Sequence, residues 1–239
     1  MRAFAYDPSI VRRYPPLVGG VIYASGLDNG PAGAELTDAF RAEQQTVRDR
    51  IGGAPLSELP TLAAWRRVFR SFGVDPTKYR SAAEALLRRL TKQGELPSIN
   101  ALVDVANLVS IRYALPVAAF DLRAVAGGID VRLARGDEPW SDLGSSETEH
   151  PEPGEVIFAD EVDTAIARRW CWRQSAATAA DEQSREVLVT IEGHHDAAYE
   201  DIAAALGDLQ ALLERHVRPA RLERAFVSAD RPRFERQQP

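Results

Sequence analysis

Residues 96–134 read LPSINALVDVANLVSIRYALPVAAFDLRAVAGGIDVRLA, and the spacing of their apolar side chains changes partway along. Over residues 99–114 the apolar side chains recur at three- and four-residue steps, which predicts a helix capped by Ser98 and ended by Pro116. Over Ile129–Leu133 they alternate with polar side chains, which predicts a strand. The helix should bury Ile99, Leu102, Val103, Ala106 and Val109. This stretch therefore joins a helical half of the chain to a strand-rich half.

The same two periodicities extend in both directions. Upstream, helices are predicted at 34–50, at 61–72 and from Ala82 to Gln93, the last with Ser81 and Glu84 as a capping box, after a strand at 17–24. Downstream, the expected elements are strands at 155–159, 165–172 and 186–191 and a helix at 197–217, with a polar loop or ragged hairpin at 134–154. Helices followed by strands predict an α+β fold, not an alternating α/β fold.

The length of 239 residues fits one large domain. We expect a single domain over 1–217, in which residues 1–60 form an N-terminal extension with a strand and a helix and residues 61–217 form the core. Residues 218–239 carry six arginines and lack periodicity, so they are expected to form a mobile C-terminal tail.

The composition is that of an ordinary globular protein, with 45% hydrophobic and 27% charged residues. No apolar run approaches the roughly 18 residues that span a bilayer, and the first residues lack the layout of a signal peptide, so we expect a cytoplasmic protein without a membrane partner. The single cysteine, Cys171, excludes a disulfide within the chain and is expected to be a packing residue. The sequence indicates no oligomeric state.

Charge is distributed unevenly along the chain, whose net charge is -6. Residues 61–92 carry eight basic and two acidic side chains, whereas residues 93–217 carry nine basic and 23 acidic ones. The basic stretch suggests an anionic partner at one end of the molecule, or a solvated helical face with no such role. The candidate RNA-binding residues in it are Arg66, Arg67, Arg70, Arg88 and Arg89.

The familiar signatures of hydrolases, nucleotide-binding proteins and zinc enzymes are missing from the sequence. His194, His195 and Asp196 are adjacent, but neighbouring side chains of an extended segment point to opposite sides and rarely ligate one ion. Asp196 fits better as the cap of the last helix. We therefore predict no metal and no cofactor.

Residues 168–174, RRWCWRQ, interleave arginine with tryptophan. In a continuous strand, Arg169, Cys171 and Arg173 would lie on one face, opposite the two tryptophans. Such a strand could stack bases and pair with phosphates. Alternatively, its tryptophans fill the core while its arginines pair with nearby carboxylates.

Several of these segments together resemble a known family. Residues 96–134 are similar to the B3 half of the B3/B4 module of the phenylalanyl-tRNA synthetase beta subunit, and Gly154–Asp160, the Arg/Trp segment and EVLVTIEG look like its B4 half. Free-standing members of the family resemble the chain further, at 71–90 and 168–175. The matching B3 positions are Ser98, Ile99, Asn100, Val103, Asp104, Val105, Asn107, Pro116, Ala119, Phe120, Asp121, Leu122, Gly127, Gly128, Val131 and Arg132.

The resemblance implies a three-layer core that contains a β-sandwich of unusual topology. It also implies tRNA or aminoacyl-tRNA as a partner, and not DNA, with hydrolysis of mischarged aminoacyl-tRNA in translation quality control as the expected activity. Asn107 falls on the family asparagine at the pocket. Two positions depart from the synthetase pattern, because Ala118 replaces a histidine and Trp172–Gln174 replaces a Gly-Gly pocket segment.

Ester hydrolysis needs a positioned water and donors for the oxyanion. The candidate catalytic residues are Asn107, Asp121 and Arg173. The candidate substrate-binding residues are Asp104, Arg132, Glu138, Arg169 and Trp172. The carboxylates among them could bind an ammonium group or orient water, or could simply cap and pair within the fold. Two other functions remain open: a non-catalytic module that binds tRNA or other RNA, and a protein that binds an amino-acid-like small molecule.

Overall fold

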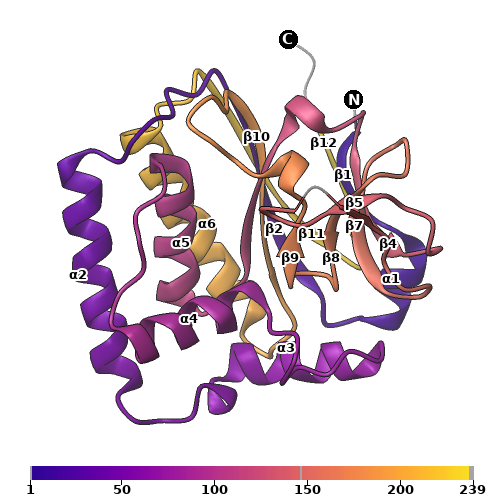
Figure 1. Ribbon diagram of the computed structural model, residues 1–239, viewed down its shortest axis with the longest axis horizontal. Coiled ribbons are helices and arrows are strands. Elements are labelled where there is room, and N and C mark those ends of the chain that lie inside the picture. Colours follow the sequence, from indigo (N-terminus) through magenta and orange to yellow (C-terminus); the bar gives the residue numbers. More distant parts are fainter. Residues whose placement is uncertain (1, 146, 237–239) are drawn as a thin grey trace.

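Strand β10 (Glu186–Gly193) lies at the centre of the protein because apolar layers cover both of its faces. Val187, Val189 and Ile191 face a layer of helices, and Leu188 faces a second sheet. The computed structural model describes residues 2–145 and 147–236. Within them, a layer of helices, a four-stranded sheet and a six-stranded sheet are stacked in that order (Figure 1).

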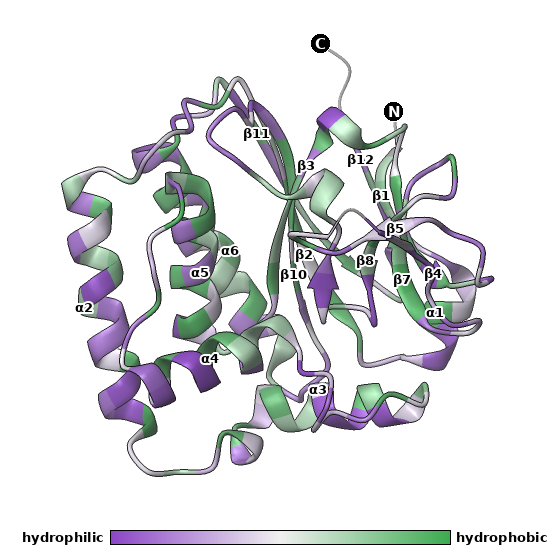
Figure 2. Ribbon diagram, in the orientation of Figure 1, coloured by the Kyte–Doolittle hydropathy of each residue, from purple (hydrophilic) through white to green (hydrophobic). Residues whose placement is uncertain are grey.

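The four-stranded sheet has the order β11-β2-β10-β3, and every neighbouring pair in it is antiparallel. Its other strands are β2 (Val18–Ser25), β3 (Val117–Asp121) and β11 (Arg221–Ser228). The helices on its outer face are α2 (Ala34–Ile51), α4 (Ala82–Gln93), α5 (Ala101–Tyr113) and α6 (Ala198–His216). Figure 2 shows hydrophobic residues gathered on the elements that face each other across these layers.

The six-stranded sheet has the order β12-β1-β4-β7-β8-β9. These strands are β12 (Arg233–Glu235), β1 (Arg2–Tyr6), β4 (Ile129–Leu133), β7 (Val156–Ala159), β8 (Ala165–Arg168) and β9 (Arg173–Gln174). Only the β1–β4 pair among them is parallel. A second hydrophobic core lies between the two sheets and includes Trp65 and Phe69 of α3 (Pro60–Ser71). The predicted α+β fold with a sandwich inside three layers is confirmed.

The remaining elements are short. Helix α1 (Pro8–Arg13) follows β1, and β5 (Trp140–Ser141) pairs with β6 (Thr148–Glu149) within 134–154, where the sequence left a loop or a ragged hairpin open. Single turns of 3-10 helix lie at Leu56–Glu58, Leu122–Ala124 and Ala176–Thr178. In the stretches 2–145 and 147–236, no helix combines the length and the apolar character that crossing a membrane requires.

Helix α5 begins later than predicted. Its cap is Asn100, whose side chain accepts a hydrogen bond from the Val103 amide, and not Ser98. The Ser98 hydroxyl and the Ile99 amide instead donate to Asp104. Since Ile99 therefore precedes the helix, its side chain is 57% exposed and is not part of the core, which corrects the prediction.

The predicted strand over 165–172 is interrupted. Arg169 and Trp170 have φ angles of 46° and 60°, in the left-handed region, so the chain turns after β8 and resumes as β9. The turn is held by a hydrogen bond of 2.6 Å from the Trp170 amide to the Val156 carbonyl. The predicted alternation of faces is therefore wrong: Trp170 is fully buried, whereas Trp172 is half-buried.

The predicted mobile tail is also wrong for the residues that the structure describes. Strand β11 pairs with β2 along all eight of its residues, and β12 pairs with β1. Residues 237–239 lie outside the described residues. At the other end of the chain, β2 of the predicted N-terminal extension lies inside the four-stranded sheet, between β11 and β10. The last helix begins after Ala197, so Asp196 is not its cap.

Candidate functional site

A cavity of about 300 Å³ lies where the three layers meet. Its walls come from α5, β3, β7, β8, β10 and the turn between β8 and β9, and the first residue of α4 lies at its edge. Most of the walls are apolar, with Val103, Phe120 and Phe158 among them. The side chains of Ile99 and Leu143 also line the cavity and are 57% and 59% exposed, so the cavity opens to solvent beside them.

Glu192 is the buried carboxyl group of this cavity. It lies on β10 two residues after Thr190, so both side chains point to the same side of the strand, and both line the cavity. Its Oε1 accepts hydrogen bonds from the Tyr6 hydroxyl at 2.8 Å and from the Trp170 indole at 3.0 Å. Burial raises the pKa of Glu192 to about 7, although both hydrogen bonds act to lower it. Within the described residues, Oε2 of Glu192 makes no hydrogen bond.

Asn107, Trp172 and Arg173 are the predicted site residues that line the cavity. Asn107 is half-buried on α5 and its side chain makes no hydrogen bond within 2–145 and 147–236. Arg173 is exposed, forms an ion pair with Asp142 of the β5–β6 hairpin, and has its guanidinium 4.8 Å from the ring centroid of Trp172. These three residues therefore line one cavity.

Asp104 does not line the cavity. Its carboxylate is fully buried and accepts from the Ser98 hydroxyl and the Ile99 amide, where it fixes the chain ahead of α5. Burial raises its pKa, against the effect of both hydrogen bonds. In this structure Asp104 therefore caps the chain within the fold, which is one of the roles that the sequence left open for the candidate carboxylates.

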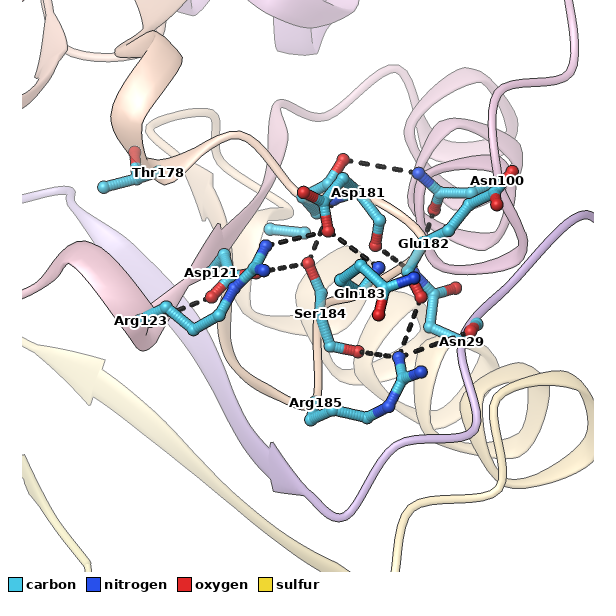
Figure 3. Close-up of polar contacts among 12 residues, drawn as sticks. Asn29, Asn100, Asp121, Arg123, Thr178, Asp181, Glu182, Gln183, Ser184 and Arg185 are labelled. Carbon is cyan, nitrogen blue, oxygen red and sulfur yellow. Dashed lines mark hydrogen bonds and ion pairs between the residues drawn. The ribbon is translucent and has the colours of Figure 1, made fainter.

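Asp121 is held in a separate polar cluster. Figure 3 shows Asp121, Arg123, Asp181 and Ser184 pointing toward one another. Asp121 accepts from the Arg123 amide at 2.8 Å, from the Arg123 guanidinium and from the Ser184 hydroxyl. Burial acts to raise its pKa, but these hydrogen bonds lower it overall, so the carboxylate is ionised and its oxygens are occupied.

Arg132 and Glu138 form an ion pair at 2.5 Å, away from the cavity lining. Glu138 also accepts from the backbone amides of Arg135 and Gly136, and so closes the loop that follows β4. Although burial opposes them, these hydrogen bonds lower the pKa of Glu138 to about 2. Asp163 pairs with Arg132 from the other side, at 2.8 Å.

Arg169 lies outside the cavity lining and stacks on two aromatic rings. Its guanidinium carbon is 3.9 Å from the ring centroid of Tyr79 and 4.6 Å from that of Trp172. Glu155 accepts from the Arg169 amide at 2.8 Å. Arg169 therefore supports Trp172 from behind the cavity wall.

The basic helices present four of the five predicted RNA-binding arginines to solvent. Arg67, Arg70, Arg88 and Arg89 are exposed on α3 and α4. Arg66 is half-buried and pairs at 2.5 Å with the buried Glu84, which joins α3 to α4. Helix α4 begins at Ala82, which lines the cavity, and Arg88 and Arg89 lie further along the helix. The basic surface therefore extends away from the site.

The residues that sequence reasoning missed are Glu192, Thr190 and Tyr6. Alternation along EVLVTIEG would have placed Thr190 and Glu192 on one face. It could not have shown that Tyr6, 186 positions away, lies against Glu192. Cys171 also lines the cavity, and burial, followed by the nearby Glu192 charge, raises the pKa of its thiol, which stays protonated.

The histidines are separated as predicted for an extended segment. His194 packs its ring against Trp65 and Trp170, and His195 pairs with Asp201 at 2.8 Å. Burial lowers the pKa of His194 to about 3, which keeps it neutral. Across the described residues, no three His, Cys, Asp or Glu side chains are grouped so that they could hold a metal ion.

Comparison with known proteins agrees with the resemblance seen in the sequence. The phenylalanine–tRNA ligase beta subunit of Staphylococcus saprophyticus is 30% identical over 154 residues, which cover 63% of this chain and 18% of the relative. The same subunit of Bradyrhizobium diazoefficiens is 32% identical over 140 residues, or 57% of this chain and 17% of the relative. The chain thus spans less than a fifth of the length of these two curated relatives.

Among solved structures, an N-terminal fragment of the phenylalanyl-tRNA synthetase beta subunit from Pyrococcus horikoshii aligns with 90% of this chain and 48% of the fragment, at 10% identity and a TM-score of 0.45. The family model described as the B3/4 domain matches residues 64–230, which include most of α3, all of α4 to α6 and most of both sheets. The chain belongs to the B3/4 domain family.

Proposed function

We propose that the protein hydrolyses the ester bond of mischarged aminoacyl-tRNA in trans, with the amino-acid side chain bound in the cavity. The observation that carries this proposal is the cavity itself, which is mostly apolar, holds about 300 Å³ and has Asn107 and Arg173 in its lining. A space of this size accepts an amino-acid side chain, whereas a folded RNA must stay outside it. The relatives, phenylalanine–tRNA ligase beta subunits, are named for a reaction on tRNA.

The chemistry requires few protein groups. A water molecule adds to the ester carbonyl, and the bond to the ribose oxygen then breaks to release the amino acid and the tRNA. The negative charge that develops on the carbonyl oxygen is stabilised by hydrogen-bond donors placed beforehand. The Asn107 amide and the Arg173 guanidinium are donors in the cavity lining, and Arg173 is held in place by Asp142 and Trp172.

The surface around the cavity suits an RNA chain at one side. Helix α4 begins at the cavity edge and carries Arg88 and Arg89, and α3 beside it carries Arg67 and Arg70 (Figure 1). Phosphates bound along these helices would place the end of the RNA near the opening. Electrostatic attraction of this kind supplies affinity without reading sequence.

The amino-acid selectivity of the synthetase cannot be carried over to this cavity. Ala118, where the synthetase pattern has a histidine, lines the cavity, and so do Trp172, Arg173 and Gln174. The amide of Gln174 is occupied by the carbonyl oxygens of Ala119 and Thr178, at 3.0 and 2.5 Å. The selectivity of this cavity therefore depends on the residues that line it.

A panel of tRNAs, each charged with a cognate or a non-cognate amino acid, tests the proposal by release of the amino acid. We expect faster hydrolysis than in buffer for at least one pair, slowed about 10- to 100-fold by Asn107→Ala and by Arg173→Ala. The exposed Arg224→Ala on β11 is the matched control and should leave the rate unchanged. No hydrolysis of any pair would refute the proposal.

The apolar lining of the cavity also favours the second function, binding of an amino-acid-like small molecule without hydrolysis. In that case free amino-acid amides would raise the unfolding temperature, while no tRNA pair would be deacylated. If instead tRNA binds with strong salt dependence and Asn107→Ala changes nothing, the protein is an RNA-binding module.

A further inference from the structure

We infer that the cavity selects a ligand whose deepest group is a cation, such as the side-chain ammonium of lysine or ornithine, and that Glu192 is the residue that selects it. This inference rests on the proposed function for the orientation of the ligand, but the selectivity itself can be measured without tRNA. Three features of the cavity lead to it: the free oxygen of Glu192, the absence of a counter-ion for it among the described residues, and the apolar walls above it.

Oε2 of Glu192 is free of hydrogen bonds to the described residues because both donors that hold the carboxyl group bond to its other oxygen, Oε1. Tyr6 from β1 and Trp170 from the turn both donate to Oε1, which fixes the carboxyl group in one orientation. Oε2 is left without a hydrogen bond to any described residue, in a side chain that is 3% exposed and lines the cavity. Thr190, on the same face of β10, adds a hydroxyl group to the same wall. An ammonium group at this position would find two oxygen acceptors.

No positive group of the described protein neutralises Glu192. Both of its donors are uncharged, and neither a lysine nor an arginine forms an ion pair with it within 2–145 and 147–236. Arg173 lines the cavity but is exposed and paired with Asp142. A buried carboxylate without a counter-ion is costly, and a bound cation would remove that cost. The other buried acids, Asp121 and Glu138, already have arginine partners.

Most of the other side chains that line the cavity are apolar. Val103, Ala119, Phe120 and Phe158 are among them, and such walls match a stem of methylene groups. In an aminoacyl-tRNA the ester and the α-carbon must stay at the opening because the RNA cannot enter. The end of the side chain is then the part that reaches Glu192.

The titratable groups that lie next to Glu192 are uncharged near neutral pH. Tyr6 and Cys171 face it, and burial raises the pKa of both, so both remain neutral. The ring of His194 packs against Trp170, whose indole donates to Glu192. His194 stays neutral because burial lowers its pKa. Binding of a cationic ligand should therefore strengthen as the solution passes from about pH 6 to about pH 8 and Glu192 ionises.

Isothermal titration calorimetry on the full chain tests the inference with matched probes. Ornithinamide and norleucinamide have side chains of the same length that end in an ammonium and a methyl group, and 5-hydroxynorvalinamide ends in a neutral donor. All three share the same amide and α-amino groups. At about pH 8 we expect ornithinamide, or its longer homologue lysinamide, to bind at least about tenfold more tightly than the neutral probes, as for other buried charge pairs.

The variant Glu192→Gln keeps an oxygen for Tyr6 and Trp170 and should reduce this preference to less than about threefold. Thr190→Val, which also leaves the Tyr6 and Trp170 hydrogen bonds in place, should weaken ornithinamide more than norleucinamide. Equal affinities of the three probes for the wild-type chain, including no binding of any, would overturn the inference, and so would an undiminished preference in Glu192→Gln.

Failure of the proposed function gives a different result. If the cationic probes are preferred but no charged tRNA is hydrolysed, the inference stands and the deacylase proposal falls. If tRNAs carrying apolar amino acids are hydrolysed while those carrying lysine or ornithine are not, the deacylase proposal stands and the inference falls.

Discussion

Glu192 and Glu138 show how one residue type acquires opposite properties from its surroundings. Glu138 accepts from two backbone amides and from Arg132, and these lower its pKa to about 2. Glu192 is buried with two neutral donors, and its pKa is raised to about 7. The first carboxylate stabilises a loop, whereas the second lines a cavity and has one oxygen without a hydrogen bond to any described residue.

We expect Glu192→Gln to gain stability relative to the wild type as the pH rises. An unfolded glutamate titrates near 4.5 and the folded one near 7, so between these values the folded state keeps a proton that the unfolded state has released. The unfolding free energy of the wild type should therefore fall across this window, by about 3 kcal/mol in total. Urea unfolding at about pH 5 and pH 8 measures it, with the Gln variant gaining on the wild type at the higher pH.

Glu138→Gln is the matched control, with the opposite sign. The folded pKa of Glu138 is lowered, so its contribution is present above the unfolded value of 4.5 and disappears as the pH falls toward 2. This variant should be less stable than the wild type at neutral pH and approach it in acid. Parallel pH profiles for the wild type and Glu192→Gln would contradict the role assigned to Glu192.

Arg66 and Arg67 are neighbours on α3 with different expected effects. Arg66→Ala removes the 2.5 Å partner of the buried Glu84 and should cost about 1–3 kcal/mol, reduced because Arg80 lies 3.9 Å from the same carboxylate. Arg67→Ala, at an exposed position, should leave the unfolding free energy within about 0.5 kcal/mol of the wild type. Thermal and urea unfolding would detect the difference, and equal losses would argue against it.

At the scale of elements, strand β11 covers what would otherwise be an open sheet edge. It pairs with β2 over eight residues, and its Val227 packs into the core between the sheets. An uncovered β2 would leave a row of unpaired backbone groups, a known site of aggregation. Residues 218–239 are rich in arginine and lack a strand periodicity, so the sequence did not predict β11.

Deleting residues 218–239 should therefore remove cooperative unfolding or lower the unfolding temperature by at least about 10 °C. Deletion of residues 237–239 alone is the control and should leave the transition where it is in the full chain. Calorimetry or circular dichroism gives the result. A shortened chain ending at Val217 that unfolds as cooperatively as the full one would show that β11 is dispensable.

At the scale of the whole molecule, the three layers bring charge and cavity together. Helix α4 of the basic surface begins at Ala82, which lines the cavity, although the chain as a whole carries a net charge of -6. A partner with phosphates would therefore approach from this side. The site and its approach depend on how the layers stack, since α4, β10 and the Trp170 turn are far apart in sequence.

We expect the double variant Arg67→Ala/Arg70→Ala to weaken tRNA binding and to reduce its salt dependence. For each phosphate that the variant no longer neutralises, the slope of log affinity against log salt should become shallower by about 0.7–0.9. Arg218→Ala/Arg224→Ala removes two exposed arginines near and on β11 and is the control. Fluorescence anisotropy between about 50 and 200 mM salt measures both. Equal slopes for the two double variants would place the RNA elsewhere.

The sequence by itself determined the kinds of element and the fold class. Helical and strand periodicities are local, so α2, α4 and α6, the capping of α4 by Ser81 and the alternation along β4 could all be predicted. The family resemblance implied a pocket position for Asn107, whose side chain is among those that line the cavity. These features depend on residues within a few positions of one another.

Only the tertiary structure decided the order of the strands, the turn at Arg169 and Trp170, and the state of Glu192. The turn exists because the Trp170 amide bonds to Val156 and its ring fills the core. Glu192 is buried by groups from β1 and from the turn, and the hydroxyl group that donates to it belongs to Tyr6, 186 residues earlier in the sequence. Desolvation and long-range pairing are properties of residues brought together by folding, so no local pattern in the sequence records them.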